Sequence, residues 1–443
     1  MDVALYSKGS PCPLPFTSLV HLFKTTKVNS HIQLMGSAHP EVVENVTPSC
    51  SGVKWTLTRL QRCGLSKESS LVVDVGATRV IEQRMECGMV VGRVAQGRMG
   101  VEFAGGKDGK PMEEREFRQQ YADVLAEETQ EEYFRKAVQQ AVQGSWTRWK
   151  EYNQRSLSWR SLVYGDVKLY RFCVGATFGT LASPSNLKRW GIDESAACTL
   201  CAKDPCTIPH VLSGCKVALG DGRYRYRHDN VLRVLCHHLS GFLNSRQMAG
   251  KRVASASASN ALVPIQFVSS GAQPVRTSGN QRSLSKPGLL LESESWKLLS
   301  DLDKRLIFPA HIVVTSLRPD IVVFSDRCKT VIMIELTCPS EENFQKQHLA
   351  KLARYTDLEA DCELAGWKVH LFAVEVGARG YTAQSLPSCL RALGLKNRPL
   401  RKCIEEAGNE ALRTSFHVWV WRDSDKWCKV GFPEKKKKAL SGQ

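Results

Sequence analysis

Two short apolar stretches decide the fold of the C-terminal half of the chain: R-P-D-I-V-V-F at residues 318–324 and V-I-M-I-E-L-T at residues 331–337. Each has the length and the Val and Ile content of a buried strand, and the short gap between them is typical of a turn. Asp320 opens the first strand, and Glu335 closes the second. If the strands pair as an antiparallel hairpin, the register can bring the two carboxylates together at one end of the sheet.

The segments around this hairpin complete a domain. Ser293 is a candidate N-cap for a helix that we expect at residues 293–306. A second helix is predicted at 341–365, and a third strand at 369–376. The order helix, strand, strand, helix, strand predicts a compact α/β domain of about 130 residues.

The two carboxylates are candidate catalytic residues and Mg2+ ligands, because Mg2+ requires hard oxygen ligands. A bound Mg2+ can orient a water molecule and neutralise the charge that builds on a scissile phosphate. The alternative interpretation is a turn acid and a strand-end acid that share no ion. The layout resembles that of a PD-(D/E)xK nuclease. The lysine that usually stands two residues beyond the second acid is replaced here by Thr337.

The predicted helix after the hairpin supplies a substitute for that lysine. Lys351 and Tyr355 are four residues apart and share one helix face. We expect the lysine to stabilise the phosphorane charge or orient the water, and the tyrosine to hydrogen-bond the phosphate. Glu341 and Glu342, near the start of this helix, are compatible with a metal site and equally with first-turn acids that complement the helix dipole.

The strongest short motif lies upstream and has the pattern C-x2-C-x8-H-x4-C. The two-residue gap between the first two cysteines lets both thiolates bind one ion. The returning His and Cys close a tetrahedron, which predicts a structural Zn2+ with no open position. The candidate ligands are Cys198, Cys201, His210 and Cys215. The alternative is four reduced side chains that happen to be adjacent, with Cys206 as a competing ligand.

The string R-Y-R-Y-R-H-D at residues 223–229 follows this motif. Guanidinium groups can bridge phosphate oxygens and tyrosine rings can stack on bases, so the string is a candidate nucleic-acid contact. Its candidate binding residues are Arg223, Arg225, Arg227 and His228. The alternative is a solvated strand or helix start with Asp229 as its cap.

The composition favours a polyanionic partner. The 443 residues include 61 Lys and Arg against 44 Asp and Glu, a formal net charge of +17, which favours nucleic acid or an anionic membrane surface. No apolar stretch approaches the roughly 20 residues that span a bilayer, and the first residues lack the pattern of a secretory signal. We expect an intracellular protein. The four lysines at 435–438 are compatible with nuclear import, with a phosphate-binding arm or with a solvated run.

Composition shifts divide the chain into six segments. A leader expected to be poorly ordered is followed by a Val- and Gly-rich segment with charged, tryptophan-containing helices. A helical region with the cysteine motif, a linker rich in Ser, Ala and Gly, the α/β domain and a basic tail complete the chain. The boundaries are 1–65, 66–165, 166–245, 246–290, 291–425 and 426–443. The expected fold class is a mainly helical N-terminal half followed by an α/β domain.

In combination, these motifs resemble a known family. The cysteine motif, the Arg-His-Asp string at 227–229, the Pro-Asp pair at 319–320 and the K-x-x-x-Y motif at 351–355 occur in the same order in the C-terminal part of certain retrotransposon polyproteins. These are site-specific non-LTR retrotransposons that carry a restriction-enzyme-like endonuclease. The likeness covers about residues 88 to 425 and includes Q-G-S-W-T-R-W at 143–149, S-P-S-N-L at 183–187 and A-L-G-D-G-R-Y-R at 218–225.

The resemblance implies an endonuclease that nicks target DNA so that the exposed 3′ end primes reverse transcription. It implies that Asp320 and Glu335 bind catalytic Mg2+, that Lys351 and Tyr355 assist, and that the Cys3His motif is a zinc knuckle. It places residues 227–229 at the junction of knuckle and nuclease. The expected partners are DNA and possible RNA targets, with no membrane and no small-molecule cofactor.

Reverse transcriptase activity is not expected. That enzyme needs a strand hairpin with paired aspartates, whereas the nearest string, Y-A-D-V at 121–124, has one aspartate inside a predicted charged helix at 113–150. The alternative function is a catalytically inactive nucleic-acid-binding protein derived from such an element, which Thr337 favours. A third is an interaction protein in which the zinc is purely structural.

Overall fold

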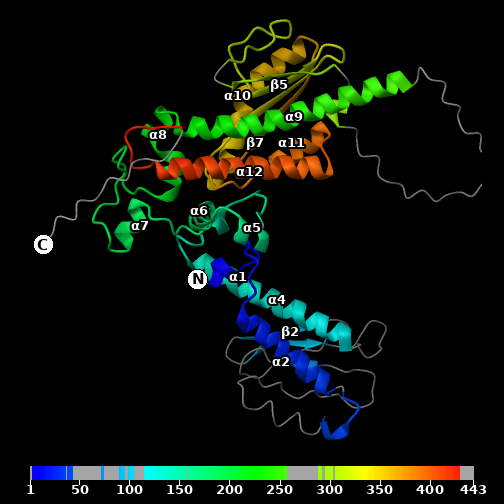
Figure 1. Ribbon diagram of the computed structural model, residues 1–443, viewed down its shortest axis with the longest axis vertical. Coiled ribbons are helices and arrows are strands. Elements are labelled where there is room, and N and C mark those ends of the chain that lie inside the picture. Colours follow the sequence, from blue (N-terminus) through cyan, green and yellow to red (C-terminus); the bar gives the residue numbers. More distant parts are fainter. Residues whose placement is uncertain are drawn as a thin grey trace, which may run out of the picture. The chain divides into compact units, whose positions relative to one another are not determined.

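Figure 1 shows the computed structural model of the protein. The structure describes residues 2–35, 37–42, 71–73, 89–94, 98–103, 114–155, 157–256, 288–291, 295–302 and 305–429. The chain divides into two compact units, one from residues 1–9 and 14–139, and the other from residues 10–13 and 140–443. No helix in the described part of the chain is long and apolar enough to cross a membrane.

In the residues that the structure describes, the first unit contains three helices and a small sheet. The helices are α1 (Asp2–Tyr6), α2 (Leu19–Met35) and α4 (Glu114–Gln139). The strands β1 (Leu71–Val73), β2 (Met89–Val94) and β3 (Arg98–Phe103) are antiparallel in the order β1-β3-β2. Helices α1 and α2 occupy part of the segment expected to be a poorly ordered leader, and its residues 43–65 lie outside the described residues.

The second unit begins with short helices around the cysteine motif. They are η3 (Ser145–Arg148), α5 (Trp159–Tyr164), α6 (Val167–Thr177), α7 (Pro184–Arg189), the π-helical turn η4 (His210–Gly214) and α8 (Lys216–Gly220). The side chain of Asp166 caps α6 by accepting the backbone N–H groups of Lys168 and Leu169. This region confirms the predicted helical segment with a Cys/His cluster.

Helix α9 (Arg223–Ala256) follows and packs against α12 (Asn397–Val420) (Figure 1). Its last residues overlap the predicted linker at 246–290, most of whose remaining residues lie outside the described part of the chain. Leu232, Leu235 and Leu239 recur on one face of α9 and are buried. The helix therefore runs from the cysteine motif across the core of the α/β domain.

The predicted α/β domain is confirmed, and it is built on a mixed four-stranded sheet, one strand more than the sequence indicated. Its strands are β4 (Lys297–Ser300), β5 (Ile321–Ser325), β6 (Thr330–Thr337) and β7 (Lys368–Glu375), in the order β4-β5-β6-β7. The first three are antiparallel, and β7 is parallel to β6. Its other elements are η5 (Leu289–Leu291), η7 (Glu341–Asn343), α10 (Phe344–Leu364) and α11 (Ser385–Leu393).

The sheet is covered by helices on both faces. Val322 and Met333 pack under α10 with Tyr355 and Leu358. The alternate residues of the strands pack on the other face against α9, α11 and α12. Burial on both faces explains why β5 and β6 are nearly continuous apolar runs rather than alternating ones.

One predicted helix is wrong. The segment expected to be helical at 293–306 contains the edge strand β4, whose Leu298 pairs with Val323. Leu298 packs against the α9 side of the sheet and Leu299 against the α10 side. Adjacent leucines on opposite faces suit a strand, and pairing with β5 outweighs the local preference for helix.

A buried ion pair fixes the start of α10. The guanidinium of Arg379 donates to Glu341 at 2.6 Å and to Glu342 at 3.1 Å, and its Nε donates to the carbonyl of Ala176 in α6 at 2.9 Å. Arg379 is 2% exposed and Glu341 1%. Both glutamates are therefore committed to Arg379, which neither of their two sequence-based interpretations anticipated.

We predict that Arg379→Met lowers the free energy of unfolding by about 3–5 kcal/mol, because it leaves Glu341 buried without its partner. The matched control is Arg413→Met, since Arg413 forms a partly exposed pair with Glu410 on α12. That change should cost about 0.5 kcal/mol or less. Urea unfolding measures both, and equal losses for the two variants would contradict the structural role given to Arg379.

Candidate metal centres

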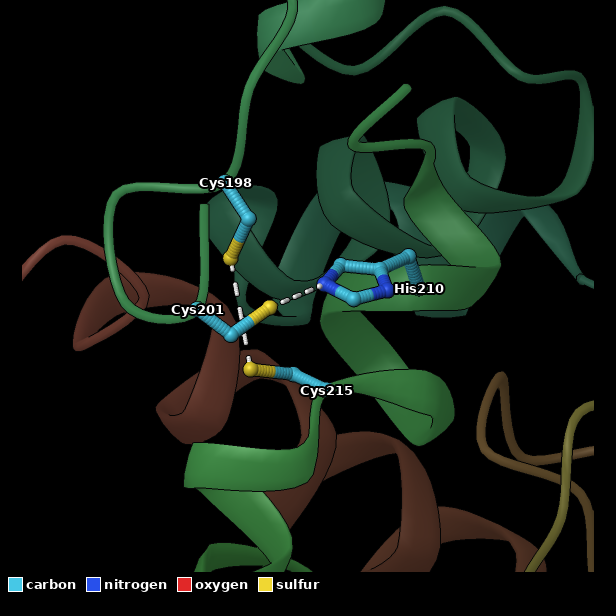
Figure 2. Close-up of side chains that lie close together, drawn as sticks. All are labelled: Cys198, Cys201, His210 and Cys215. Atoms are coloured by element: carbon cyan, nitrogen blue, oxygen red, sulfur yellow. Dashed lines mark hydrogen bonds between the residues drawn. The ribbon is translucent and has the colours of Figure 1, made fainter. Parts of the chain in front are cut away.

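Four side chains converge in the helical part of the second unit (Figure 2). Cys198 and Cys201 lie in the loop after α7, His210 begins η4, and Cys215 precedes α8. Their ligand atoms all lie within 4.8 Å of one another. The Sγ atoms of Cys198 and Cys215 are 4.0 Å apart, and Sγ of Cys201 is 3.3 Å from Nε2 of His210. This Cys3His donor set fits a tetrahedral zinc ion, as predicted.

The loop around the first two cysteines is closed by backbone hydrogen bonds. The N–H of Cys198 donates to the carbonyl of Lys203 at 2.9 Å, and the N–H of Ala202 donates back to Cys198 at 2.8 Å. Ala202 has a positive φ of 56°, which tightens the turn. These hydrogen bonds hold the thiols of Cys198 and Cys201 where both can bind the same ion.

Cys206 does not join the cluster. It is 1% exposed, and burial together with the neighbouring Cys198 raises its pKa to about 12. The ligand atoms that lie within 4.8 Å of one another belong to Cys198, Cys201, His210 and Cys215, and this group does not include Cys206.

The pKa values of three ligands, Cys201, His210 and Cys215, are shifted by their surroundings. Burial lowers the pKa of His210, so its imidazole is neutral at pH 7. Burial raises the pKa of Cys215 to about 11. Burial also opposes the Cys201 thiolate, but hydrogen bonds from Lys203 and Cys215 outweigh it and lower the pKa of Cys201. Zinc binding must therefore expel protons from thiols.

Tyr224 in the first turn of α9 ties two ligand segments together. Its hydroxyl oxygen accepts the N–H of Cys215 at 3.0 Å and donates to the carbonyl of Val211 at 2.9 Å. By contrast, the buried Nδ1 of His210 has no hydrogen-bond partner among the described residues. The outer support of the cluster therefore comes through the backbone rather than through the imidazole.

The second centre is the acid pair at the end of β5 and β6. Ile321 pairs with Ile334, so the next positions outward are Asp320 and Glu335. Oδ2 of Asp320 accepts the N–H of Leu336 at 2.8 Å, and Oε2 of Glu335 accepts the N–H of Asp320 at 3.2 Å. Both residues are buried. The register thus brings the two carboxylates together as the sequence predicted.

Lys351 lies beside this pair. Lys351 belongs to α10, and its Nζ donates a hydrogen bond to Oε1 of Glu335. Burial raises the pKa of Glu335, the charge of Asp320 adds to that effect, and Lys351 opposes it. Oδ1 of Asp320 accepts no hydrogen bond from any described residue. The site therefore combines two carboxylates, one ammonium and an available carboxylate oxygen.

Tyr355 and Thr337 contribute differently from Lys351. The Tyr355 side chain is buried, and its hydroxyl donates to the carbonyl of Arg318 at 3.1 Å. Its hydroxyl thus supports the turn before Asp320. Burial raises the pKa of Tyr355, and an interaction of the hydroxyl with the Glu335 side chain raises it further. Thr337 lies at the usual lysine position, and its Oγ1 is buried without a partner among the described residues.

His228 is the residue whose position the sequence missed. Its Nε2 is 3.2 Å from Oδ2 of Asp320, and its Nδ1 is 3.0 Å from Oδ1 of Asp229. Arg225 holds the same Oδ1 of Asp229 at 2.7 Å. His228 therefore contacts the acid pair, a position for which no local sequence signal exists.

Two of the predicted nucleic-acid contacts need correction. Arg223 and Arg227 are each 1% exposed. Arg223 pairs with Asp221 at 2.7 Å and donates to the carbonyls of Trp421 and Ser424. Because their guanidinium groups are buried in contacts within the protein, these two arginines are not presented to a phosphate. Arg225 remains partly exposed, with a side chain 34% accessible.

A cleft of about 610 Å³ opens over the acid pair. Its wall includes five Arg and Lys residues, Arg225, Arg227, Arg318, Lys351 and Arg354, of which Arg227 is 1% exposed, and also His228, Asp320, Glu335 and Thr337. Basic side chains around paired acids can draw a phosphate backbone toward the carboxylates. The cleft therefore joins residues from α9, the β5–β6 hairpin and α10.

Two comparisons with known proteins identify no relative. A scan against protein-family models finds no match, and a search of curated proteins finds no similar sequence. The Cys3His cluster and the mixed sheet with its helices are the features that the structure shares with the expectations of the resemblance.

We predict that the purified protein holds one zinc ion per chain and that Cys201→Ser or Cys215→Ser releases it. Structural zinc contributes about 10–16 kcal/mol in finger peptides, so both variants should also lose thermal stability. Metal analysis by mass spectrometry and thermal unfolding measure the two effects. Cys206→Ala should retain the zinc, and zinc loss in that variant with retention in the other two would contradict the assigned ligands.

We also predict how the stabilising effect of the His228 imidazole depends on pH in Mg2+-free buffer. Burial favours neutral His228, but the hydrogen bonds and charges of Asp229 and Asp320 outweigh it and raise its pKa from 6.5 to about 9. Its stabilising effect is therefore complete below pH 6.5 and is lost as the pH rises through about 9. The stability gap between wild type and His228→Gln should narrow over that range in urea titrations. A gap that stays constant would show that the charged imidazole contributes nothing.

Proposed function

We propose that the protein is a metal-dependent DNA endonuclease of retroelement origin, in which a zinc knuckle accompanies a restriction-enzyme-like domain. The observation that carries the proposal is the convergence of Asp320, Glu335 and Lys351 at the floor of a basic cleft. The resemblance of the motif order supports it. Phosphodiester hydrolysis is the chemistry that such a cluster suits best.

Asp320 and Glu335 would hold the catalytic Mg2+. Their hard oxygen donors and the available Oδ1 of Asp320 fit such an ion. When bound, the ion would supply charge neutralisation at the scissile phosphate and a position for water. His228 and Lys351 lie at hydrogen-bonding distance from Asp320 and Glu335, respectively. These two basic groups thus keep the acids in place within a buried site.

Lys351 has a second role in the proposal. Its side chain is 23% exposed while its ammonium contacts Glu335, so it borders both the acid pair and the cleft. An ammonium held there is positioned to stabilise negative charge that develops on a phosphoryl group. It would take the part of the lysine that Thr337 replaces.

The partner in this proposal is DNA, held by the basic wall of the cleft. Arg225 on α9 and Arg354 on α10 supply positive charge to the wall of the cleft. They replace the buried Arg223 and Arg227 as the expected phosphate contacts. RNA would compete for the same wall, because phosphate contacts are largely independent of the sugar. The proposed compartment is the nucleus, where the DNA target lies.

The alternative is a nucleic-acid-binding protein with an inactive site. Thr337 favours it, because its buried hydroxyl lies where a nuclease of this type usually has a lysine. Both functions predict binding that weakens steeply with salt as phosphate contacts release counterions. Only a cleavage experiment separates them.

We predict that zinc-loaded protein nicks supercoiled plasmid in the presence of Mg2+, and that Asp320→Asn, Glu335→Gln and Lys351→Met each lower the rate at least about 100-fold. The matched control is Asp357→Asn, an exposed carboxylate on the outer side of α10. It should nick at the wild-type rate. Salt-dependent DNA binding by folded wild-type protein without any nicking would exclude the nuclease and support the inactive alternative.

A further inference from the structure

The zinc cluster is connected to the acid pair through the first two turns of α9. The connection begins at Tyr224, whose hydroxyl bonds the backbone of Cys215 and Val211. Cys215 is a ligand, and Val211 follows the ligand His210. The start of α9 is therefore fixed to the knuckle and not merely next to it in the chain.

Arg227 carries the connection across to the sheet. Its Nη1 donates to the carbonyl of Leu212 at 2.8 Å and to Oγ of Ser415 at 3.1 Å. Its Nη2 donates to the carbonyl of Cys338 at 2.9 Å. Leu212 belongs to the knuckle, and Cys338 lies three residues beyond Glu335. One buried guanidinium thus joins the knuckle, α12 and the end of β6.

His228 completes the connection at the carboxylate. Its Nε2 and the N–H of Leu336 both lie at Oδ2 of Asp320, at 3.2 Å and 2.8 Å. Asp229 holds the other imidazole nitrogen and is itself held by Arg225. Two partners on one oxygen fix the rotation of the carboxylate, and they leave Oδ1 as the oxygen without a partner among the described residues.

We propose that His228 is a positioning residue for Asp320, and that the zinc knuckle acts on the nuclease site by holding His228 in place through Arg227. This inference deepens the proposed function and rests on it for the role of Asp320. It assigns the knuckle a part in organising the acid pair in addition to any contact with nucleic acid. A misplacement of about 1 Å at a reacting centre can cost about 100-fold in rate.

The test uses the full chain with zinc bound and compares His228→Gln, Arg227→Lys and a matched control, His238→Gln. His238 lies on the same helix and bonds Glu406 at 2.7 Å, away from the acid pair. Amide hydrogen exchange is followed by NMR at Asp320 and Leu336, whose N–H groups donate to the paired carboxylates. Plasmid nicking is measured in parallel, with kcat and KM separated.

We expect exchange at these two amides to be about tenfold faster in His228→Gln and Arg227→Lys than in His238→Gln, with zinc content near that of His238→Gln and a smaller change at amides elsewhere in the sheet. A global loss of stability would accelerate exchange throughout the sheet, so the local effect identifies positioning. The nicking kcat should fall about 100-fold with KM little changed.

Unchanged exchange at both amides in both variants would overturn the positioning role. If the wild type does not nick at all, the proposed nuclease fails, while the exchange comparison still decides whether the knuckle positions Asp320. If the wild type nicks and both variants nick at the same rate with the same exchange, the positioning inference fails and the nuclease stands.

Discussion

The register of one antiparallel hairpin is the constraint on which the second unit depends. Ile321 opposes Ile334, and this pairing sets Asp320 against Glu335 at the end of the sheet. A shift of either strand by one residue would turn its acid to the other face, among the apolar side chains of α9, α11 and α12, and would separate the two carboxylates. Burial of both sheet faces holds the register, so the same packing that stabilises the domain also assembles the candidate site.

The fold class and the two clusters could be predicted because their signals are local. The Cys3His spacing fixes its own geometry within eighteen residues, and two apolar runs with a short turn define a hairpin. Lys351 follows from helix periodicity once the hairpin is known. The strand β4 could not be found this way, because Leu298 and Leu299 become strand residues only through pairing with β5.

The burial of two arginines in the R-Y-R-Y-R-H-D string could not be predicted, for a related reason. Its residues were assigned by chemical type, as arginines and tyrosines that suit nucleic acid. Burial reverses that assignment for Arg223 and Arg227, and a contact 92 positions away along the chain gives His228 its place. Contacts between residues so far apart in the chain cannot be inferred from the spacing of residues in a motif. The string is thus the junction of the zinc cluster with the acid pair, and Arg225 is its remaining solvent-facing arginine.

The central claim is that the acid pair is a metal site organised beside a zinc cluster. Crystals of zinc-loaded protein soaked in Mn2+ test it directly, because anomalous scattering distinguishes the two metals at their absorption edges. The account predicts a zinc peak among Cys198, Cys201, His210 and Cys215, and a manganese peak that contacts Asp320 and Glu335. A zinc peak at the cysteines with no manganese at the carboxylates, at a concentration that saturates exposed acids, would contradict it.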